Sequence, residues 1–411
     1  MAGHIQDRWY KTETDTNGKT ARVKTDRHGT GMRYRARYIG PDGTEKSKSF
    51  PDGQKRVAER WLSGIEADMT RGQYIDPKAG RLTVRQHADR WLSSLTMDPG
   101  TFVGTEQRVR LHILPNLGSR PLGSLRPIHI REWLRELQDA GIAPSYQRVI
   151  YATLSAMLTA AVDDQTIPSN PCRSNSVRAP KADPRRVVPW ERERVFAVRA
   201  ALPTQYRALV DLASGCGLRQ GEVFGLAVQD IDFAANVVHV IRQVKRIRNR
   251  PLFASPKSGK PRTVPLPASV ARRLREHIVE HPPAGVTLPW RVLDGRPVTA
   301  TLLFHQGAAE PVNRNSFNRW TWRPALAAVG VPDGRENGTH ALRHFYASVL
   351  LDAGESIKAL SEYLGHHDPG FTLRTYTHLM QSSETRTRSA VDRVFGGSPE
   401  DDDGPTTARA A

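Results

Sequence analysis

The opening part of the chain has a period-two pattern followed by a helical one. Residues 32–38 alternate arginine with aromatic or small side chains, which predicts a strand with its basic side chains on one face. Those basic side chains are Arg33, Arg35 and Arg37. A Pro-Asp-Gly turn at 41–43 leads into a second predicted strand at 44–50. Apolar positions at helical spacing then predict a helix over 54–69, so we expect a small sheet and a helix with a basic face.

A second region, 82–172, reads as mostly helical. Prolines stand between its helical segments, where they can begin or end a helix without breaking one. The predicted helices are 84–95, 104–113, 128–140 and 145–163. Segments at 72–80 and 177–186 predict linkers on either side of this helical region.

The third region mixes helical and strand patterns. Helices are predicted at 204–215 and 220–226, strands at 237–243 and 262–266, and several more helices follow to about residue 395. The sequence after that point predicts a disordered tail.

The whole pattern predicts an α+β multidomain protein, because each region can bury its own core. The expected parts are a small β-sheet plus helix at 1–71, a helical domain at 81–176, a mixed but mainly helical domain with a small antiparallel sheet at 188–395, and a tail at 396–411.

The composition of the chain indicates what kind of partner it binds. The 411 residues include 60 Lys and Arg against 42 Asp and Glu, a formal net charge of +18, which favours a polyanionic partner. Mean hydropathy is −0.52 and no apolar run approaches the ~20 residues of a membrane-spanning helix, so a membrane partner is not expected. The start of the chain has no signal-peptide core, and only Cys172 and Cys216 occur, which argues against a disulfide framework and a four-cysteine zinc site. We expect a cytoplasmic protein.

A one-sided basic run covers 233–275, where eleven Lys or Arg residues occur without any Asp or Glu. Such runs are also common on solvated surfaces, and the sequence alone leaves both interpretations open. The residues of this run that we expect to contact nucleic acid are Arg242, Lys245, Arg246 and Lys260.

Two arginines stand where a phosphate could be bound. Attack on a phosphodiester places charge on its non-bridging oxygens, and the planar guanidinium fork meets this charge with two hydrogen bonds. Arg219 precedes a predicted helix, where Glu222 three residues later could brace it, and Arg343 lies three residues after His340 on one helical face. A neutral His340 could accept a proton or bind a phosphate oxygen.

The remaining candidates complete a reaction that needs neither metal nor cofactor. Tyr376 is the expected nucleophile, although its phenol needs nearby cations or a base to react at neutral pH. His366 follows Gly365, which suits the end of a helix at 357–364. Lys257, in a segment whose Pro and Gly predict a hairpin tip, could protonate a leaving 5′ oxygen, with Lys260 as its competitor.

Taken singly, each of these residues has a structural explanation. A lone tyrosine on a helix usually packs, a lone arginine in a turn is usually a surface charge, and a lone histidine is usually structural. The functional interpretation rests on the combination of these residues and on their order along the chain.

That combination resembles the tyrosine recombinase, or phage integrase, family over about 188–395. The motifs that carry the resemblance are 217–222, 256–266, 340–348 and 364–376. The resemblance implies that Arg219, Lys257, His340, Arg343 and His366 bind and activate the scissile phosphate of double-stranded DNA, and that Tyr376 forms a 3′-phosphotyrosine link. It also implies a homotetramer on two DNA duplexes that exchanges strands through a Holliday junction.

The rest of the chain is similar to the same family. The region 82–172 resembles its SAM-like core-binding domain. About the first 65 residues resemble the arm-binding sheet of integrases of phages and integrative elements, so we expect Arg33, Arg35 and Arg37 to contact DNA. By the same resemblance, 382–395 is a segment that packs on a neighbouring subunit, and an excision factor and a DNA-bending protein are partners on the bacterial nucleoid. Phe345 departs from the Ser or Thr of many members.

Two other functions remain open at this point. A type IB topoisomerase uses the same residue types but rejoins the original strand. A DNA-binding regulator could keep the fold without catalysis, although binding alone does not need a tyrosine at position 376.

Overall fold

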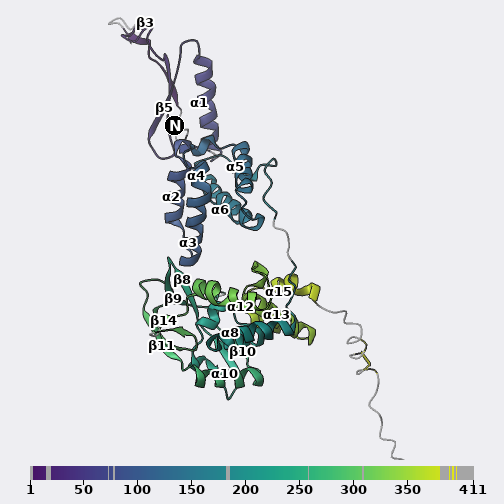
Figure 1. Cartoon of the computed structure of the whole chain (residues 1–411). Helices are drawn as coiled ribbons and strands as arrows, with labels where there is room; N and C mark the ends of the chain where they lie inside the picture. Colours follow the sequence, from purple (N-terminus) through teal and green to yellow (C-terminus); the bar gives the residue numbers. More distant parts are fainter. Residues whose placement is uncertain are drawn as a thin grey trace, which may run out of the picture. The chain divides into compact units, whose positions relative to one another are not determined.

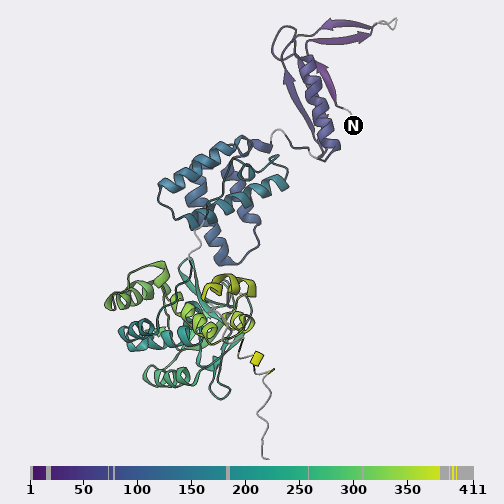
Figure 2. The same cartoon turned by 90° about the vertical axis from the view of Figure 1, so that its right-hand side faces the viewer.

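The computed structural model describes residues 3–14, 20–72, 74–76, 79–181, 186–257, 259–307 and 310–379, together with 388, 391, 392 and 395. It divides into two compact units, Met1–Asp183 and Pro184–Ala411 (Figures 1 and 2). The expected tail at 396–411 lies outside the described residues, as does most of the segment at 382–395. Among the helices that the structure describes, none is long and apolar enough to span a membrane.

The N-terminal part forms an antiparallel sheet in the order β1-β4-β5, with the helix α1 packed on it. The elements are β1 (His4–Asp7), β2 (Tyr10–Thr14), β3 (Thr20–Lys24), β4 (Tyr34–Ile39), β5 (Glu45–Phe50) and α1 (Lys55–Thr70). Tyr34, Ala36 and Tyr38 are buried while the alternate arginines of β4 are not, as the sequence predicts. The pattern did not predict β1 or the β2–β3 hairpin, because their side chains are mostly polar and exposed.

The helical part of the first unit surrounds a core that includes Trp133, Ile150 and Leu154. Its elements are η1 (Ala79–Arg81), α2 (Val84–Ser94), α3 (Pro99–Arg108), η2 (Val109–Ile113), α4 (Leu114–Leu117), η3 (Leu122–Ser124), α5 (Pro127–Asp139), α6 (Pro144–Asp163) and η4 (Pro171–Arg173). The predicted helix at 104–113 begins earlier, at Pro99, because the Asp98 side chain accepts hydrogen bonds from the first backbone amides.

The helices of the second unit pack around α8, which is buried along most of its length. They are α7 (Arg192–Ala201), α8 (Thr204–Gly215), α9 (Gln220–Phe224), η5 (Val228–Asp230), α10 (Ala268–Glu280), α11 (Arg314–Phe317), η6 (Asn318–Trp322), α12 (Arg323–Ala328), η7 (Arg335–Asn337), α13 (His340–Asp352), α14 (Ile357–Leu364), α15 (Pro369–Tyr376) and η8 (Thr377–Leu379). Both α10 and α13 contact α8 (Figure 1), and α14 contacts both α13 and α15, which brings these three helices together.

The strands of the second unit form one three-stranded sheet, in the order β10-β7-β6, and three hairpins. They are β6 (Ile231–Asp232), β7 (Val237–Val240), β8 (Gln243–Ile247), β9 (Arg250–Ala254), β10 (Arg262–Pro265), β11 (Ala284–Pro289), β12 (Pro297–Leu302), β13 (His305–Gln306) and β14 (Glu310–Pro311). The mainly α character with a small antiparallel sheet is as predicted.

The loop that carries Lys257 and Lys260 is not the hairpin tip that the sequence suggested. The two predicted strands do pair, as β7 and β10, but β8 and β9 form a separate hairpin between them. The loop therefore connects β9 to a different sheet. The sequence did not reveal β8 and β9 because their basic side chains hide the strand pattern, and their turn uses Arg248 and Asn249 at positive φ.

Candidate active site

The guanidinium of Arg343 joins three segments that are far apart in sequence. Its residue is 1% exposed, on the inner face of α13. Nη1 donates to the carbonyl oxygen of Gly217 at 2.6 Å, and Nη2 donates to the carbonyl oxygen of Leu364. Its Nε is buried without an acceptor among the described residues. The Nε donor of this buried guanidinium is thus left unpaired by the described residues.

Glu222 holds two further arginines from opposite sides. One carboxylate oxygen accepts from Arg219 Nη1 at 2.9 Å, and the other accepts from the Arg219 backbone N–H at 2.9 Å. Arg262, on β10, donates to both oxygens, at 3.0 and 2.6 Å. Burial alone would raise the pKa of Glu222, but the hydrogen bonds and charge of Arg262, and then the charges of Arg219 and Arg343, lower it to about 2. The carboxylate therefore stays ionised and holds the guanidinium groups of Arg219 and Arg262 in place.

This cluster has more positive than negative charge. Arg219 and Arg262 are hydrogen-bonded to the one carboxylate of Glu222, and the charge of Arg343 also acts on it. Burial and then the charge of Arg219 lower the pKa of Arg343, so its cationic form is held at an electrostatic cost. An anion beside the forks would reduce that cost, which makes the cluster suited to a phosphate.

Two glycines allow these contacts by adopting left-handed backbone conformations. Gly217 has a φ of +65°, and a Cβ there would lie 2.5 Å from the ring of Tyr346. Gly365 has a φ of +60° and ends α14, as its sequence position predicted. The Gly365 carbonyl accepts a hydrogen bond from Arg219 Nη2 at 3.2 Å. The turn after α14 therefore helps to orient Arg219.

His366 follows that turn and is fixed by α15. Its Nδ1 is 2.7 Å from the hydroxyl of Thr372, a fully buried residue, and its ring meets Phe371 edge-on. Burial, followed by the charges of Arg343 and Arg219, lowers the pKa of His366 to about 3. The ring is neutral at physiological pH, with Nε2 left for another partner.

Tyr376, the expected nucleophile, ends α15 and is 1% exposed. Its hydroxyl lies 2.8 Å from Nδ1 of His344. Burial raises the pKa of the phenol to about 12, against the charges of Arg343 and Arg219, which lower it. Both arginines of the proposed clamp thus act electrostatically on this hydroxyl.

His340 and Lys257 lie at the more open side of the cluster. His340, the first residue of α13, is exposed in part. Burial of the rest of the residue lowers its pKa to about 3, and His344, Arg343, Arg219 and Lys257 lower it further. Lys257 is exposed at the start of the loop after β9. Its charge acts on His340, so the loop reaches the neighbourhood of this histidine.

Sequence reasoning missed three residues of this site. His344 contacts the phenol, Arg262 shares Glu222 with Arg219, and Thr372 fixes His366. A signal existed for His344 alone, because it lies four residues after His340 and thus on the same helical face. Nothing in the spacing of Arg262 or Thr372 indicates these contacts.

The expected DNA contacts of the N-terminal sheet are engaged within the protein. Arg33 donates to Asp7 and Asp52, Arg37 pairs with Glu45, and Arg35 donates to the hydroxyl of Ser47. The carboxylates of Asp52 and Glu45 are about half exposed. The basic face is therefore partly neutralised at its surface.

The expected contacts of the second unit differ among themselves. Lys260 is exposed, Lys245 is half-buried, and Arg246 donates to the carbonyl oxygen of Asn249. Arg242 departs from the expectation, because its guanidinium is buried and donates to Asp230 at 2.6 Å. That arginine is occupied inside the domain, by an acidic residue that lies just outside the acid-free run.

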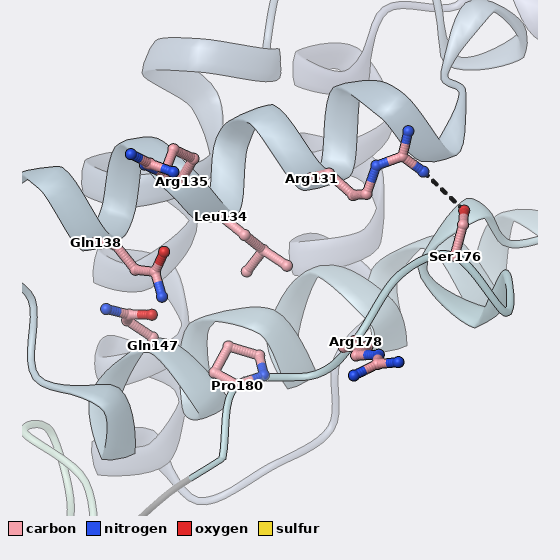
Figure 3. Close-up of a pocket in the computed structure, with 8 residues that line it drawn as sticks. All are labelled: Arg131, Leu134, Arg135, Gln138, Gln147, Ser176, Arg178 and Pro180. Atoms are coloured by element: carbon pink, nitrogen blue, oxygen red, sulfur yellow. Dashed lines mark hydrogen bonds between the residues drawn. The ribbon is translucent and has the colours of Figure 1, made fainter.

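A separate pocket of about 400 Å³ lies in the helical part of the first unit. It is lined by Arg131, Leu134, Arg135, Gln138, Gln147, Ser176, Arg178 and Pro180 (Figure 3). Arg131 donates to Ser176 at 2.8 Å, and Arg135 is paired with Asp139 at 3.2 Å. Three guanidinium groups thus surround a hollow without a carboxylate in its lining.

Comparison with known protein families and relatives places this site in context. Residues 191–383 match the phage integrase family, and residues 83–138 match the N-terminal SAM-like domain of phage integrases. A XerC-like tyrosine recombinase of Caldanaerobacter subterraneus is 26% identical, over 94% of this chain and 99% of its own length. The integrase of Mycobacterium phage D29 is 25% identical, over 86% of this chain and 91% of its own length.

Solved structures show the same fold. The Tn1549 transposon integrase, in complex with a circular intermediate DNA, matches with a TM-score of 0.64 and 21% identity, over 76% of this chain and 99% of that one. A lambda integrase tetramer bound to a Holliday junction matches with a TM-score of 0.55 and 18% identity, over 83% of this chain and 91% of that one. The family matches and the full-length relatives together show that the chain belongs to the phage integrase family of tyrosine recombinases.

Proposed function

We propose that this site-specific recombinase cleaves and rejoins DNA through Tyr376, with Arg219 and Arg343 as the clamp on the scissile phosphate. The observation that carries the proposal is the convergence of these three residues. Their segments are far apart in sequence, yet Arg343 and Arg219 donate to the adjacent carbonyl oxygens of Leu364 and Gly365, in the turn that leads into the helix carrying Tyr376. Integration or excision of a mobile element is the biological outcome that fits the phage integrase relatives.

The proposed cleavage step follows from the hydrogen-bond donors around the guanidinium groups of Arg219 and Arg343. The phosphate oxygens receive hydrogen bonds from Arg219 and Arg343, and from His340 and His366 as neutral donors. The Tyr376 oxygen attacks phosphorus as the bond to the 5′ oxygen breaks, and Lys257 gives that oxygen a proton. The 3′-phosphotyrosine keeps the energy of the broken bond, so a 5′ hydroxyl from a second duplex can reverse the step and exchange strands.

The other parts of the chain supply DNA binding in this proposal. We assign 1–71 to arm-type sites, 81–176 to the core site and 188–395 to catalysis. The three-arginine pocket of Figure 3 is suited to a backbone phosphate, because charge-assisted hydrogen bonds could replace the contacts that Arg131 and Arg135 now make.

The assembly in this proposal is a homotetramer on two duplexes, as in the lambda integrase tetramer bound to a Holliday junction. An excision factor and a DNA-bending protein would set the direction of the reaction. Such an assembly would place the protein on the bacterial nucleoid.

A covalent trapping assay tests the role of Tyr376. On a nicked substrate that loses its 5′ fragment, the wild-type chain should accumulate a protein–DNA adduct. Tyr376→Phe should abolish the adduct and leave site binding within about twofold, because only the nucleophilic oxygen is removed. An adduct that persists in this variant would exclude Tyr376 as the nucleophile.

Two DNA assays with the wild-type chain distinguish recombination from topoisomerase activity, which the family relatives do not favour. Exchange between two supercoiled or linear attachment sites supports recombination. Relaxation of a supercoiled plasmid without any exchange would support a topoisomerase instead.

A further inference from the structure

The residue in contact with the reacting phenol is His344, which the sequence gave no role. Its Nδ1 lies 2.8 Å from the Tyr376 hydroxyl, and the two rings meet edge-on with centroids 5.6 Å apart. The contact joins the first turns of α13 to the last residue of α15. It fixes both the position of the phenolic oxygen and the direction of its hydrogen bond.

The protonation states define which partner donates. Burial, and then the charge of Arg343, lower the pKa of His344 to about 4, so the imidazole is neutral at physiological pH. The phenol is protonated at the same pH, since its own pKa is raised. A neutral imidazole with its proton on Nε2 presents the Nδ1 lone pair to the Tyr376 O–H, and this tautomer makes the hydrogen bond a path for the proton.

The other titratable groups near this bond have different contacts. On α13, His340 meets the His344 ring edge-on with centroids 4.6 Å apart, and Arg343 donates to two backbone carbonyls. Beside α14 and α15, His366 is tied to Thr372. Arg219, before α9, is tied to Glu222. Among the described histidines, His344 is the one whose nitrogen is hydrogen-bonded to Tyr376.

We propose that His344 is a catalytic residue that holds the Tyr376 hydroxyl and accepts its proton during strand cleavage. This inference rests on the proposed role of Tyr376 as nucleophile. It assigns the proton to His344 rather than to His340, which remains free to bind a phosphate oxygen. His344 would become cationic only when it takes the proton of the phenol. At that moment the negative charge of the phosphate is close by.

The step balances in protons and bonds. The O–H bond of Tyr376 breaks and its proton passes to His344 Nδ1, while the new O–P bond forms and the bond from phosphorus to the 5′ oxygen breaks. The 5′ oxygen takes a proton from Lys257 and leaves as a hydroxyl. During rejoining both transfers reverse, so His344 returns the proton to Tyr376 and the chain is regenerated.

His344→Asn separates holding from proton transfer. The Asn side-chain oxygen can accept the phenolic hydrogen bond near the position of Nδ1, but an amide does not take up the proton. We expect adduct formation on the nicked substrate to slow by about 100-fold or more, the scale for losing a general base, with DNA binding unchanged. His367→Asn, at an exposed histidine of the same segment as His366, is the matched control and should react like the wild type.

The pH profile gives a readout that a merely structural role would not change. Between roughly pH 6 and 9 the wild-type cleavage rate should be nearly flat with respect to this group, because neutral His344 is already present. In His344→Asn the rate should rise about tenfold per pH unit, because hydroxide must then remove the proton. A near-normal rate, or a slow rate whose pH profile parallels the wild type, would overturn the assignment of His344 as proton acceptor.

Three further measurements distinguish a failed proposal from a misfolded variant or a wrong nucleophile. A substrate with sulfur at the 5′ bridging position needs no acid for its leaving group, so it should rescue Lys257→Ala and leave His344→Asn slow. Rescue of His344→Asn by that sulfur would count against the proposal. Tyr376→Phe on the same substrates tests the nucleophile separately, because an adduct in that variant would remove the proposed function itself. A thermal melt of each variant confirms that it is folded.

Discussion

The arginines of the N-terminal sheet and those of the catalytic cluster have opposite charge environments. On the sheet, Arg33 has two carboxylate partners and Arg37 has one, and these pairs are in contact with solvent. In the cluster, Arg219 and Arg262 are bonded to Glu222, and the buried Arg343 has no closer carboxylate partner among the described residues. The comparison shows that the number of basic residues does not identify a phosphate site. An incomplete set of buried counter-charges is the more informative feature.

The largest effect should come from removing the shared counter-charge. Glu222→Gln removes a buried carboxylate and leaves the half-buried Arg219 and Arg262 without it, so we expect the free energy of unfolding to fall by about 3 kcal/mol or more. Chemical denaturation of the full chain would measure it. If the free energy of unfolding fell by less than about 1 kcal/mol, these arginines would not depend on Glu222 as their counter-charge.

Acidification should produce a comparable loss by the same route. The pKa of Glu222 is lowered from 4.5 to about 2 in the folded chain, so its contribution is present above the unfolded value and is lost as pH falls from about 5 toward 2. The lowered pKa values of His340, His344 and His366 act in the same direction from about pH 6.5 downward, because the unfolded chain binds those protons first.

A pH series of thermal melts measures this loss. The Tm should fall steadily below about pH 6.5, and Glu222→Gln should flatten the part of the curve below pH 5. An identical curve in wild type and variant at low pH would contradict the lowered pKa of Glu222.

The next effect concerns catalysis rather than stability. Arg343→Lys keeps a positive charge but loses the planar fork, so it cannot hold the Gly217 and Leu364 carbonyls and a phosphate oxygen together. Adduct formation should slow by about 100-fold or more. Binding to the DNA site, followed by gel shift, should change far less. Equal losses in binding and cleavage would mean that Arg343 contributes to DNA affinity in general rather than to the cleavage step.

The smallest effect is expected on the N-terminal sheet. Glu45→Gln removes the partner of Arg37 at a position where water can replace it, so stability should change by less than about 1 kcal/mol. DNA affinity should rise slightly, and its dependence on salt should steepen, because one more arginine is free for a phosphate. A loss of several kcal/mol here would remove the contrast between the two regions.

Local patterns were sufficient where one helix or strand determined the outcome. The burial of Tyr34, Ala36 and Tyr38 follows from period-two alternation, and the end of α14 at Gly365 follows from the left-handed conformation that glycine allows. The nearness of His340 and Arg343 also follows from helical spacing, since the charge of Arg343 contributes to lowering the pKa of His340.

Tertiary contacts determined what the sequence did not reveal. The burial of Arg242 depends on Asp230, which approaches it only when β6 and β7 pair. The role of His344 depends on α15 returning to the start of α13, and no spacing within α13 encodes that approach. The polar hairpins β2–β3 and β8–β9 lack the apolar alternation on which strand prediction relies.

The turn at 364–365 accepts hydrogen bonds from both arginines of the proposed clamp, since Arg343 donates to the Leu364 carbonyl and Arg219 to the Gly365 carbonyl. A phosphate held by the same two side chains would therefore be coupled to this turn. Because the turn leads into α15, the two guanidinium groups would set the position of the phosphate and that of the Tyr376 hydroxyl together.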